Sequence, residues 1–240
     1  MKKNMALVHK ILIIAIAVIT VRPAVADETQ YPYSIRKGEI TVFGHTLNSK
    51  EIRSTEEDQN YVSFIESPNK QRILILYDEP FERGAAWLYD KTTKTTPQPV
   101  GTVRLGRHFS AEWYGDNVFA IFGTGMGYKL SRLFRIEQLN RYKEVNDIVE
   151  YDPKRDIYAS LLRDSEFKYF IVVGRAFHFE EKEERFPVQM NDEDLVTADT
   201  GGYINNLEFS RRGFSISYEN KKSKEVTETF QTRIIENAKP

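Results

Sequence analysis

The stretch Ile73-Leu74-Ile75-Leu76-Tyr77 predicts a buried β-strand, because its five consecutive apolar residues include β-branched and aromatic side chains. The stretch Tyr169-Phe170-Ile171-Val172-Val173 predicts a second buried strand. In Phe214-Ser215-Ile216-Ser217-Tyr218 apolar and polar residues alternate, which predicts a strand with one apolar face and one polar face. Aromatic residues make up 12% of the chain and favour strands as well. The sequence therefore favours an all-β fold.

Turn signals recur along the chain in a fixed context. Each turn follows a short predicted strand that ends in a glutamate, and an apolar strand follows each turn. The turns are Ser67-Pro68-Asn69, Gly115-Asp116-Asn117, Asp152-Pro153-Lys154 and Arg211-Arg212-Gly213. The glutamates are Glu66, Glu112, Glu150 and Glu208. Three of these units continue with a further strand and a polar stretch that ends on a valine, at Val100, Val145 or Val188.

A pattern of strands that recurs at roughly 40–50 residues is typical of propeller blades. We therefore predict a propeller-like array of about four or five antiparallel sheets, with internal repeats over about residues 60–230. A β-sandwich of consecutive meanders is the alternative, because it would leave a similar pattern. A mixed α+β fold is the third interpretation. The segment from Leu130 to Val149 is rich in helix formers, and its apolar spacing does not decide between helix and strand.

The first 26 residues have the three parts of a cleavable secretory signal. Lys2, Lys3 and Lys10 form a positive start, and Ile11 to Val21 is an uncharged apolar run. The stretch Ala24-Val25-Ala26 then provides small residues for cleavage. The apolar run is shorter than the about 20 residues that a membrane-spanning helix needs. We expect cleavage after Ala26, no membrane anchor afterwards, and a single all-β domain over residues 27–240.

Composition limits the compartment and the partners. The chain has no cysteine, which together with the absence of glycosylation sequons favours a bacterial periplasm, with secretion as the alternative. The chain carries 34 basic and 35 acidic residues. The signal holds four of the bases and none of the acids, so the mature chain is mildly acidic. This argues against nucleic acid as a partner.

The sequence contains no convincing catalytic set, and we expect no metal site and no cofactor. The pair His178 and Glu180 would share one face of a strand, but a solvated strand end explains both residues better. The four recurrent glutamates would provide carboxylates if they converged on one axis. One residue type at one position of every unit more often has a structural role.

Two surface features suit recognition of a protein partner. Arg and large aromatic residues are enriched among interface anchors, and an acidic run steers association with a basic partner. The candidate partner-binding residues are Arg104, Arg107, His108, Trp113, Tyr114, Glu180, Glu181, Glu183 and Glu184. Core packing is the competing explanation for the tryptophan segment, and a solvated face for the acidic run.

We therefore expect a non-enzymatic, exported protein-binding module whose partner is another envelope or exported protein. An inhibitor or immunity-type protein is a specific version of this hypothesis. A carboxylate-dependent hydrolase or glycan-active enzyme is the first alternative, and a small-ligand sensor module is the second.

Overall fold

The computed structural model describes residues 31–36, 38–49, 52, 61–78, 84–103, 108–125, 128–166, 168–190, 204–220, 222 and 224–238. The predicted signal at residues 1–26 lies outside the described residues. In chain order the strands are β1 (Tyr33–Arg36), β2 (Glu39–Val42), β3 (His45–Asn48), β4 (Val62–Glu66), β5 (Arg72–Asp78), β6 (Gly84–Asp90), β7 (Gln98–Val103), β8 (His108–Trp113), β9 (Val118–Gly125), β10 (Tyr128–Arg135), β11 (Tyr142–Asp152), β12 (Ile157–Arg163), β13 (Tyr169–Arg175), β14 (Glu184–Val188), β15 (Ile204–Phe209), β16 (Gly213–Glu219) and β17 (Glu225–Gln231). The 3-10 helix η2 (Ile136–Gln138) and the α-helix α1 (Arg233–Asn237) complete the described elements.

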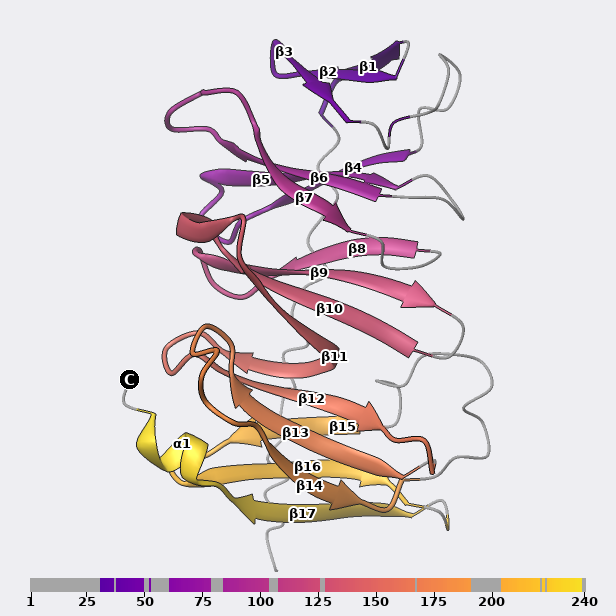
Figure 1. Ribbon diagram of the computed structural model, residues 1–240, viewed down its shortest axis with the longest axis vertical. Coiled ribbons are helices and arrows are strands. Elements are labelled where there is room, and N and C mark those ends of the chain that lie inside the picture. Colours follow the sequence, from indigo (N-terminus) through magenta and orange to yellow (C-terminus); the bar gives the residue numbers. More distant parts are fainter. Residues whose placement is uncertain are drawn as a thin grey trace, which may run out of the picture.

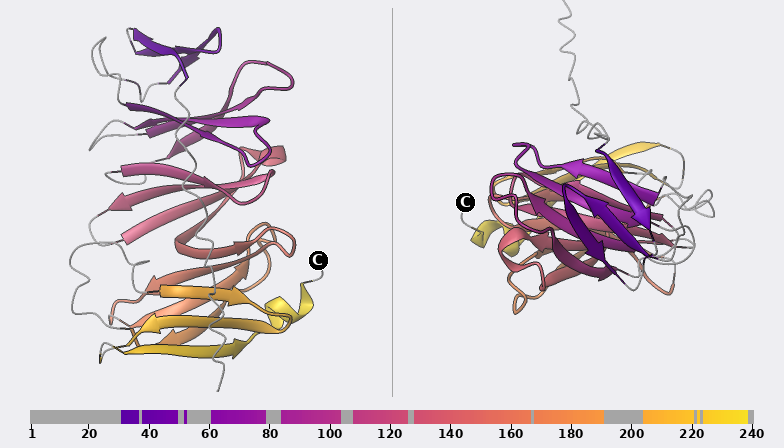
Figure 2. Two further views of the ribbon diagram at one scale, coloured as in Figure 1. Left: turned by 180° about the vertical axis from the view of Figure 1, so that it is seen from behind. Right: turned by 90° about the horizontal axis from the view of Figure 1, so that it is seen from above.

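The fold is all-β, and the predicted array of antiparallel sheets is confirmed. The described strands form four antiparallel sheets of 3, 4, 7 and 3 strands, and in each sheet the strands pair in chain order. The sheets stack along the long axis of the molecule as an open array (Figure 1). Seen along that axis, they lie on top of one another (Figure 2).

The seven-stranded sheet is folded into two layers at β11. Residues 142–146 of β11 pair with β10, and residues 147–152 pair with β12, with a register shift between Ile148 and Glu150. We therefore describe five layers. Layer A is β1–β3, layer B is β4–β7, and layer C is β8–β10 with residues 142–146. Layer D is residues 147–152 with β12–β14, and layer E is β15–β17.

In the described part of the chain, a hydrophobic cluster lies between each two consecutive layers. Strand β5 shows why: Ile73, Ile75 and Tyr77 belong to the cluster between layers A and B. Leu74 and Leu76 belong to the cluster between layers B and C. All five side chains are fully buried, because side chains of a strand alternate between its faces and both faces are covered here.

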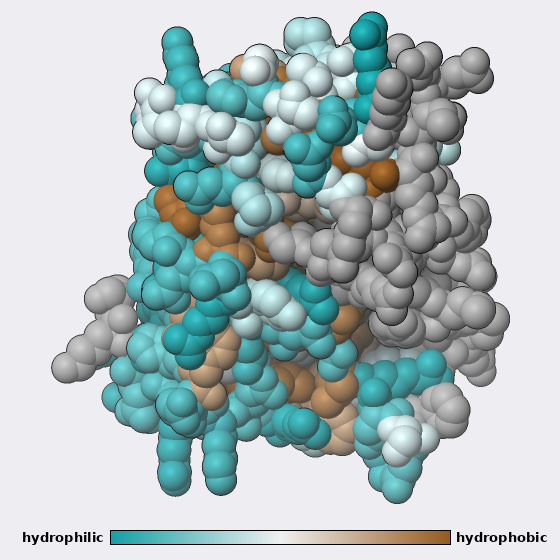
Figure 3. Space-filling view, turned by 45° about the horizontal axis from the view of Figure 1, so that its top comes forward, coloured by the Kyte–Doolittle hydropathy of each residue, from teal (hydrophilic) through white to brown (hydrophobic). Residues whose placement is uncertain are grey.

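The two end layers each have one apolar face and one polar face. In β16, Phe214, Ile216 and Tyr218 pack against layer D. On the other face, Ser217 shares a hydrogen bond of 2.8 Å with the hydroxyl of Thr227. Layer A presents a hydrophilic to neutral outer face, and apolar side chains show chiefly at the seams between layers (Figure 3).

One side of the stack carries the turns that the sequence predicts, and we call it the turn side. These are residues 67–71, 114–117, 153–156 and 210–212. Successive turns contact one another. The backbone N–H of Asn69 donates to Oδ1 of Asp116 at 3.0 Å, and the guanidinium of Arg155 donates to the carbonyl oxygen of Ser210 at 2.6 Å. Helices η2 and α1 lie on the same side (Figure 1).

The segment from Leu130 to Val149 is not helical as a whole. It contains most of β10, the short η2 and the first part of β11. Pairing of β10 with β9 and β11 outweighs the helix propensity of these residues. No helix among the described residues reaches the length and apolarity needed to span a bilayer.

Candidate functional site

The predicted tryptophan segment lies partly inside the stack. Arg104 and Arg107 fall outside the described residues, and His108 is placed only as the first residue of β8. The indole N–H of Trp113 donates to the carbonyl oxygen of Ile65 at 3.1 Å. Its ring lies 5.2 Å from that of Phe119. Trp113 therefore joins layer C to layer B.

Tyr114 joins layer C to layer D in a similar way. Its ring packs edge-on against Tyr151, with 5.4 Å between centroids. Its hydroxyl donates to Glu112 at 3.4 Å. Burial raises the pKa of Tyr114 well above the ordinary value, and the charges of Glu112 and Glu150 raise it further. The contacts of Tyr114 are those of a packing residue.

The four recurrent glutamates have different neighbours. Glu66 forms an ion pair with Lys91 and accepts a hydrogen bond from Tyr31. Glu208 accepts a hydrogen bond from Asn206 at 2.9 Å. Burial raises the pKa of Glu150, and the charge of Glu112 raises it further.

Glu150→Gln is expected to stabilise the protein at pH 7. A carboxyl group whose pKa is raised by folding stabilises the folded state below its unfolded pKa, and this contribution is lost as the pH rises through the folded pKa. At pH 7, where the glutamate of an unfolded chain is charged, the environment of Glu150 therefore disfavours folding. Gln retains an oxygen that accepts the N–H of Tyr151, a bond of 3.0 Å in the wild-type chain.

Urea denaturation at pH 7 checks this expectation, with Glu208→Gln in layer E as the matched control. The advantage of Glu150→Gln should shrink as the pH falls through the raised pKa of Glu150 and should be absent below about 4.3, the ordinary pKa of a glutamate. An equal gain from both variants, or a gain that persists in acid, would contradict it.

A different set of residues forms the exposed site, which we call the β11 face. It consists of Arg132, Arg141, Tyr142, Lys143, Glu144, Phe179 and Glu183. Residues 142–144 begin β11 at the edge of layer C, where β10 is their strand partner, and Arg141 directly precedes them. Arg132 lies on β10, and Phe179 and Glu183 lie on the connection between β13 and β14.

Tyr142 is the exposed aromatic residue of the β11 face. It is 40% exposed, and among the described residues no other large hydrophobic side chain is exposed. Its ring rests on the buried ring of Phe134, with 5.4 Å between centroids. The guanidinium of Arg132 lies 4.6 Å from the ring of Tyr142 and forms an ion pair with Glu144 at 2.9 Å. The exposed ring therefore packs against both Phe134 and Arg132.

Two neighbours of Tyr142 connect layer C to layer D. The guanidinium of Arg141 lies 4.0 Å from the ring of Phe179, in a cation–π contact. The ammonium group of Lys143 lies 2.9 Å from the Glu183 carboxylate, which also accepts a hydrogen bond from Tyr158. Burial opposes the charge of Glu183, but these two partners outweigh it and lower the pKa of Glu183.

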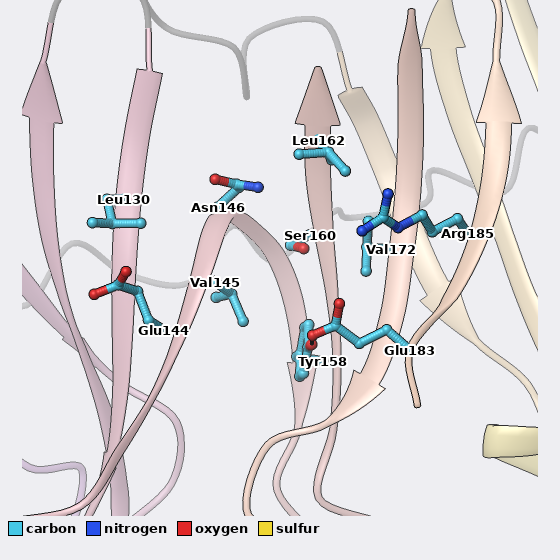
Figure 4. A pocket seen from close by; sticks show the side chains of 10 residues that line it. All are labelled: Leu130, Glu144, Val145, Asn146, Tyr158, Ser160, Leu162, Val172, Glu183 and Arg185. Carbon is cyan, nitrogen blue, oxygen red and sulfur yellow. Dashed lines mark hydrogen bonds between the residues drawn. The ribbon is translucent and has the colours of Figure 1, made fainter. Parts of the chain in front are cut away.

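A small pocket of about 170 Å³ opens beside the β11 face, where β11 passes from layer C to layer D. Figure 4 shows it between β10 and β11 on one side and β12 to β14 on the other. Its apolar lining comes from Leu130, Val145, Leu162 and Val172. Its polar lining comes from Glu144, Asn146, Tyr158, Ser160, Glu183 and Arg185.

The glutamates of the predicted acidic run therefore have different surroundings: some are exposed, and others form ion pairs. Glu180 is exposed, and Glu184 begins β14. Glu181 forms an ion pair with Arg175 at 3.5 Å. Glu183 belongs to the β11 face. Within the described residues, no three His, Asp or Glu side chains are grouped closely enough to hold a metal ion.

The fold and the site define an all-β protein of stacked antiparallel layers with an Arg- and aromatic-rich edge. The chain matches no protein family model and no curated protein.

Proposed function

We propose that this chain is an exported, periplasmic protein that binds another exported protein through the β11 face. The export signal predicted from the sequence and the lack of cysteine support the compartment. The exposed ring of Tyr142, packed on Phe134, carries the proposal of a protein partner. Tyr and Arg are the residue types that most often anchor interfaces, and both occur here side by side.

The surroundings of Tyr142 support a role in binding. The β11 face lies on paired strands and is braced by Arg132 and Phe134. Binding therefore fixes few additional side chains, which lowers its entropic cost. Charged residues around the ring provide a polar rim. The adjacent pocket is smaller than the several hundred cubic ångströms typical of small-molecule sites, so it suits a side chain of the partner better than a free ligand.

An inhibitor or immunity-type role is the specific form of the proposal. Such a protein needs a rigid surface that covers part of its target, and it needs no catalytic group of its own. The continuous hydrophobic packing through the five layers supports that rigidity.

Site-specific photo-crosslinking tests the proposal in cells that produce the full-length chain. A photoreactive amino acid in place of Tyr142 should form a defined adduct with one protein, and Arg141→Ala should reduce the yield of that adduct. The matched control position is Thr41, which is exposed on β2 at the outer face of layer A. Absence of an adduct at position 142, or the same adducts at both positions, would contradict the proposal.

Carboxylate chemistry is the second candidate function, and the raised pKa of Glu150 beside Glu112 favours it. A hydrolase of the two-carboxylate type needs one protonated and one charged carboxyl group. If this pair were catalytic, Glu150→Gln would abolish hydrolysis of glycan substrates while stabilising the fold. A wild-type chain that hydrolyses none of them would reject this candidate.

A further inference from the structure

Layers D and E form a second pocket on the turn side, with a volume of about 530 Å³. It lies between the turn that follows β11 and the turn that follows β15, close to the end of α1. Its lining consists of Asp152, Lys154, Arg155, Arg211, Arg212, Glu236 and Ala238. None of these residues belongs to the β11 face.

The first turn has a hydrogen-bonded backbone and one paired cationic side chain, that of Arg155. Oδ1 of Asp152 accepts the backbone N–H of Lys154 at 2.9 Å and that of Arg155 at 3.3 Å. Oδ2 of Asp152 pairs with the guanidinium of Arg155 at 2.6 Å. The same guanidinium donates to the carbonyl oxygen of Ser210, which ties this turn to the second one.

The second turn presents two neighbouring arginines from an equally fixed backbone. The N–H of Ser210 donates to the carbonyl oxygen of Gly213 at 2.8 Å, and the N–H of Thr232 donates to that of Arg212 at 3.0 Å. The hydroxyl of Ser210 accepts the N–H of Gly213 at 3.1 Å. The backbone from which Arg211 and Arg212 extend is therefore held by hydrogen bonds on both sides.

The charges of the pocket are unbalanced. Lys154, Arg211 and Arg212 have no side-chain hydrogen bond or ion pair with another described residue. Arg155 and Asp152 neutralise each other. Glu236 offsets one of the three remaining cations, which leaves an excess of two positive charges facing the pocket.

We propose that this pocket binds a phosphomonoester. Such a group carries about 1.5 to 2 negative charges at neutral pH, which matches the excess positive charge. The planar fork of an arginine binds two phosphate oxygens at once, and two arginines on one turn provide two such forks. The volume of the pocket accommodates the phosphate together with part of the group that bears it. The phosphomonoester belongs either to a soluble small molecule or to a lipid headgroup.

Titration of the mature, full-length chain at fixed ionic strength tests the proposal. Glucose 6-phosphate and inorganic phosphate are the soluble probes, and glucose is their uncharged control. Phosphatidylcholine vesicles with and without phosphatidic acid probe the lipid source. We expect binding to at least one phosphate-bearing probe and none to glucose or to pure phosphatidylcholine. Soluble binding alone assigns the soluble source, and binding that needs phosphatidic acid assigns the lipid source.

A matched pair of double variants decides whether the pocket is responsible. Arg211→Ala/Arg212→Ala should weaken binding by about tenfold or more, because two charged hydrogen-bond donors are lost. Lys222→Ala/Lys224→Ala removes the same charge from exposed residues at the opposite end of β16 and should leave binding unchanged. If no probe binds, or if both double variants weaken binding equally, the proposal is wrong.

Discussion

Leu74→Ala and Ile75→Ala are each expected to lower the free energy of unfolding by about 2–5 kcal/mol, the range for truncating a fully buried aliphatic side chain. These residues are adjacent on β5 and point to opposite faces. Leu74 belongs to the cluster between layers B and C, and Ile75 to the cluster between layers A and B. Both side chains are 0% exposed. Truncation of either therefore leaves a cavity between two layers.

Strand β16 provides the matched control, because layer E has only one covered face. Ile216→Ala should cost a similar amount, since Ile216 is 1% exposed. Ser215→Ala, at the adjacent residue on the other face, should change stability by less than about 0.5 kcal/mol. Urea denaturation followed by tryptophan fluorescence measures all four variants. If only one of the two β5 variants were destabilised, β5 would have only one buried face, against the stacked-layer account.

Gly213→Ala is expected to destabilise the protein by about 3 kcal/mol or more, because the added methyl group would collide with rigid backbone. A Cβ atom at this position would lie 1.8 Å from the carbonyl oxygen of Phe230. That carbonyl belongs to β17, the strand partner of β16. The methyl group therefore forces the two strands apart at the start of the hairpin.

Gly44→Ala is the control for Gly213→Ala. Gly44 has a φ of +78°, and a Cβ atom there would meet nothing within 4 Å. Gly44→Ala should lower the free energy of unfolding by only about 1–2 kcal/mol, which is the cost of a left-handed backbone conformation for a residue with a side chain. Thermal unfolding followed by circular dichroism compares the two variants. A Gly213→Ala variant as stable as Gly44→Ala would mean that the hairpin of layer E accommodates a side chain at its first residue.

Much of the fold could be predicted from the sequence, because the spacing of apolar residues along a strand shows which of its faces are buried. The unbroken apolar run Ile73–Tyr77 indicates a strand covered on both faces, and Phe214–Tyr218 indicates a strand covered on one face. Glu66 is the last residue of its strand, as expected, whereas the strands of Glu112, Glu150 and Glu208 continue to Trp113, Asp152 and Phe209. The open stacking of the layers could not be predicted, because strand order within a layer does not determine whether layers close into a ring.

The candidate sites were harder to predict. Most of the β11 face lies in the segment from Leu130 to Val149, which is rich in helix formers and could not be assigned to strands from the sequence. The exposure of Tyr142 could therefore not be inferred from the sequence. The basic pocket joins two turns that the sequence marks only as turns. Arg155 and Ser210 are far apart in the chain. Only the tertiary structure brings the guanidinium of Arg155 to 2.6 Å from the carbonyl oxygen of Ser210. Trp113 and Tyr114 were candidates for partner binding because large aromatic residues beside a turn suit an interface. In the structure both rings pack between layers.

The most direct test of the central claim is the dissociation constant of the complex between this chain and the protein captured at position 142. Arg141→Ala/Tyr142→Ala should raise that constant by about 30-fold or more, as expected when interface anchors are lost. Lys222→Ala/Lys224→Ala should leave it unchanged, and circular dichroism should show that both variants are folded. A double variant at the β11 face that binds the partner as tightly as the unaltered chain would contradict the proposal that this face is the binding surface.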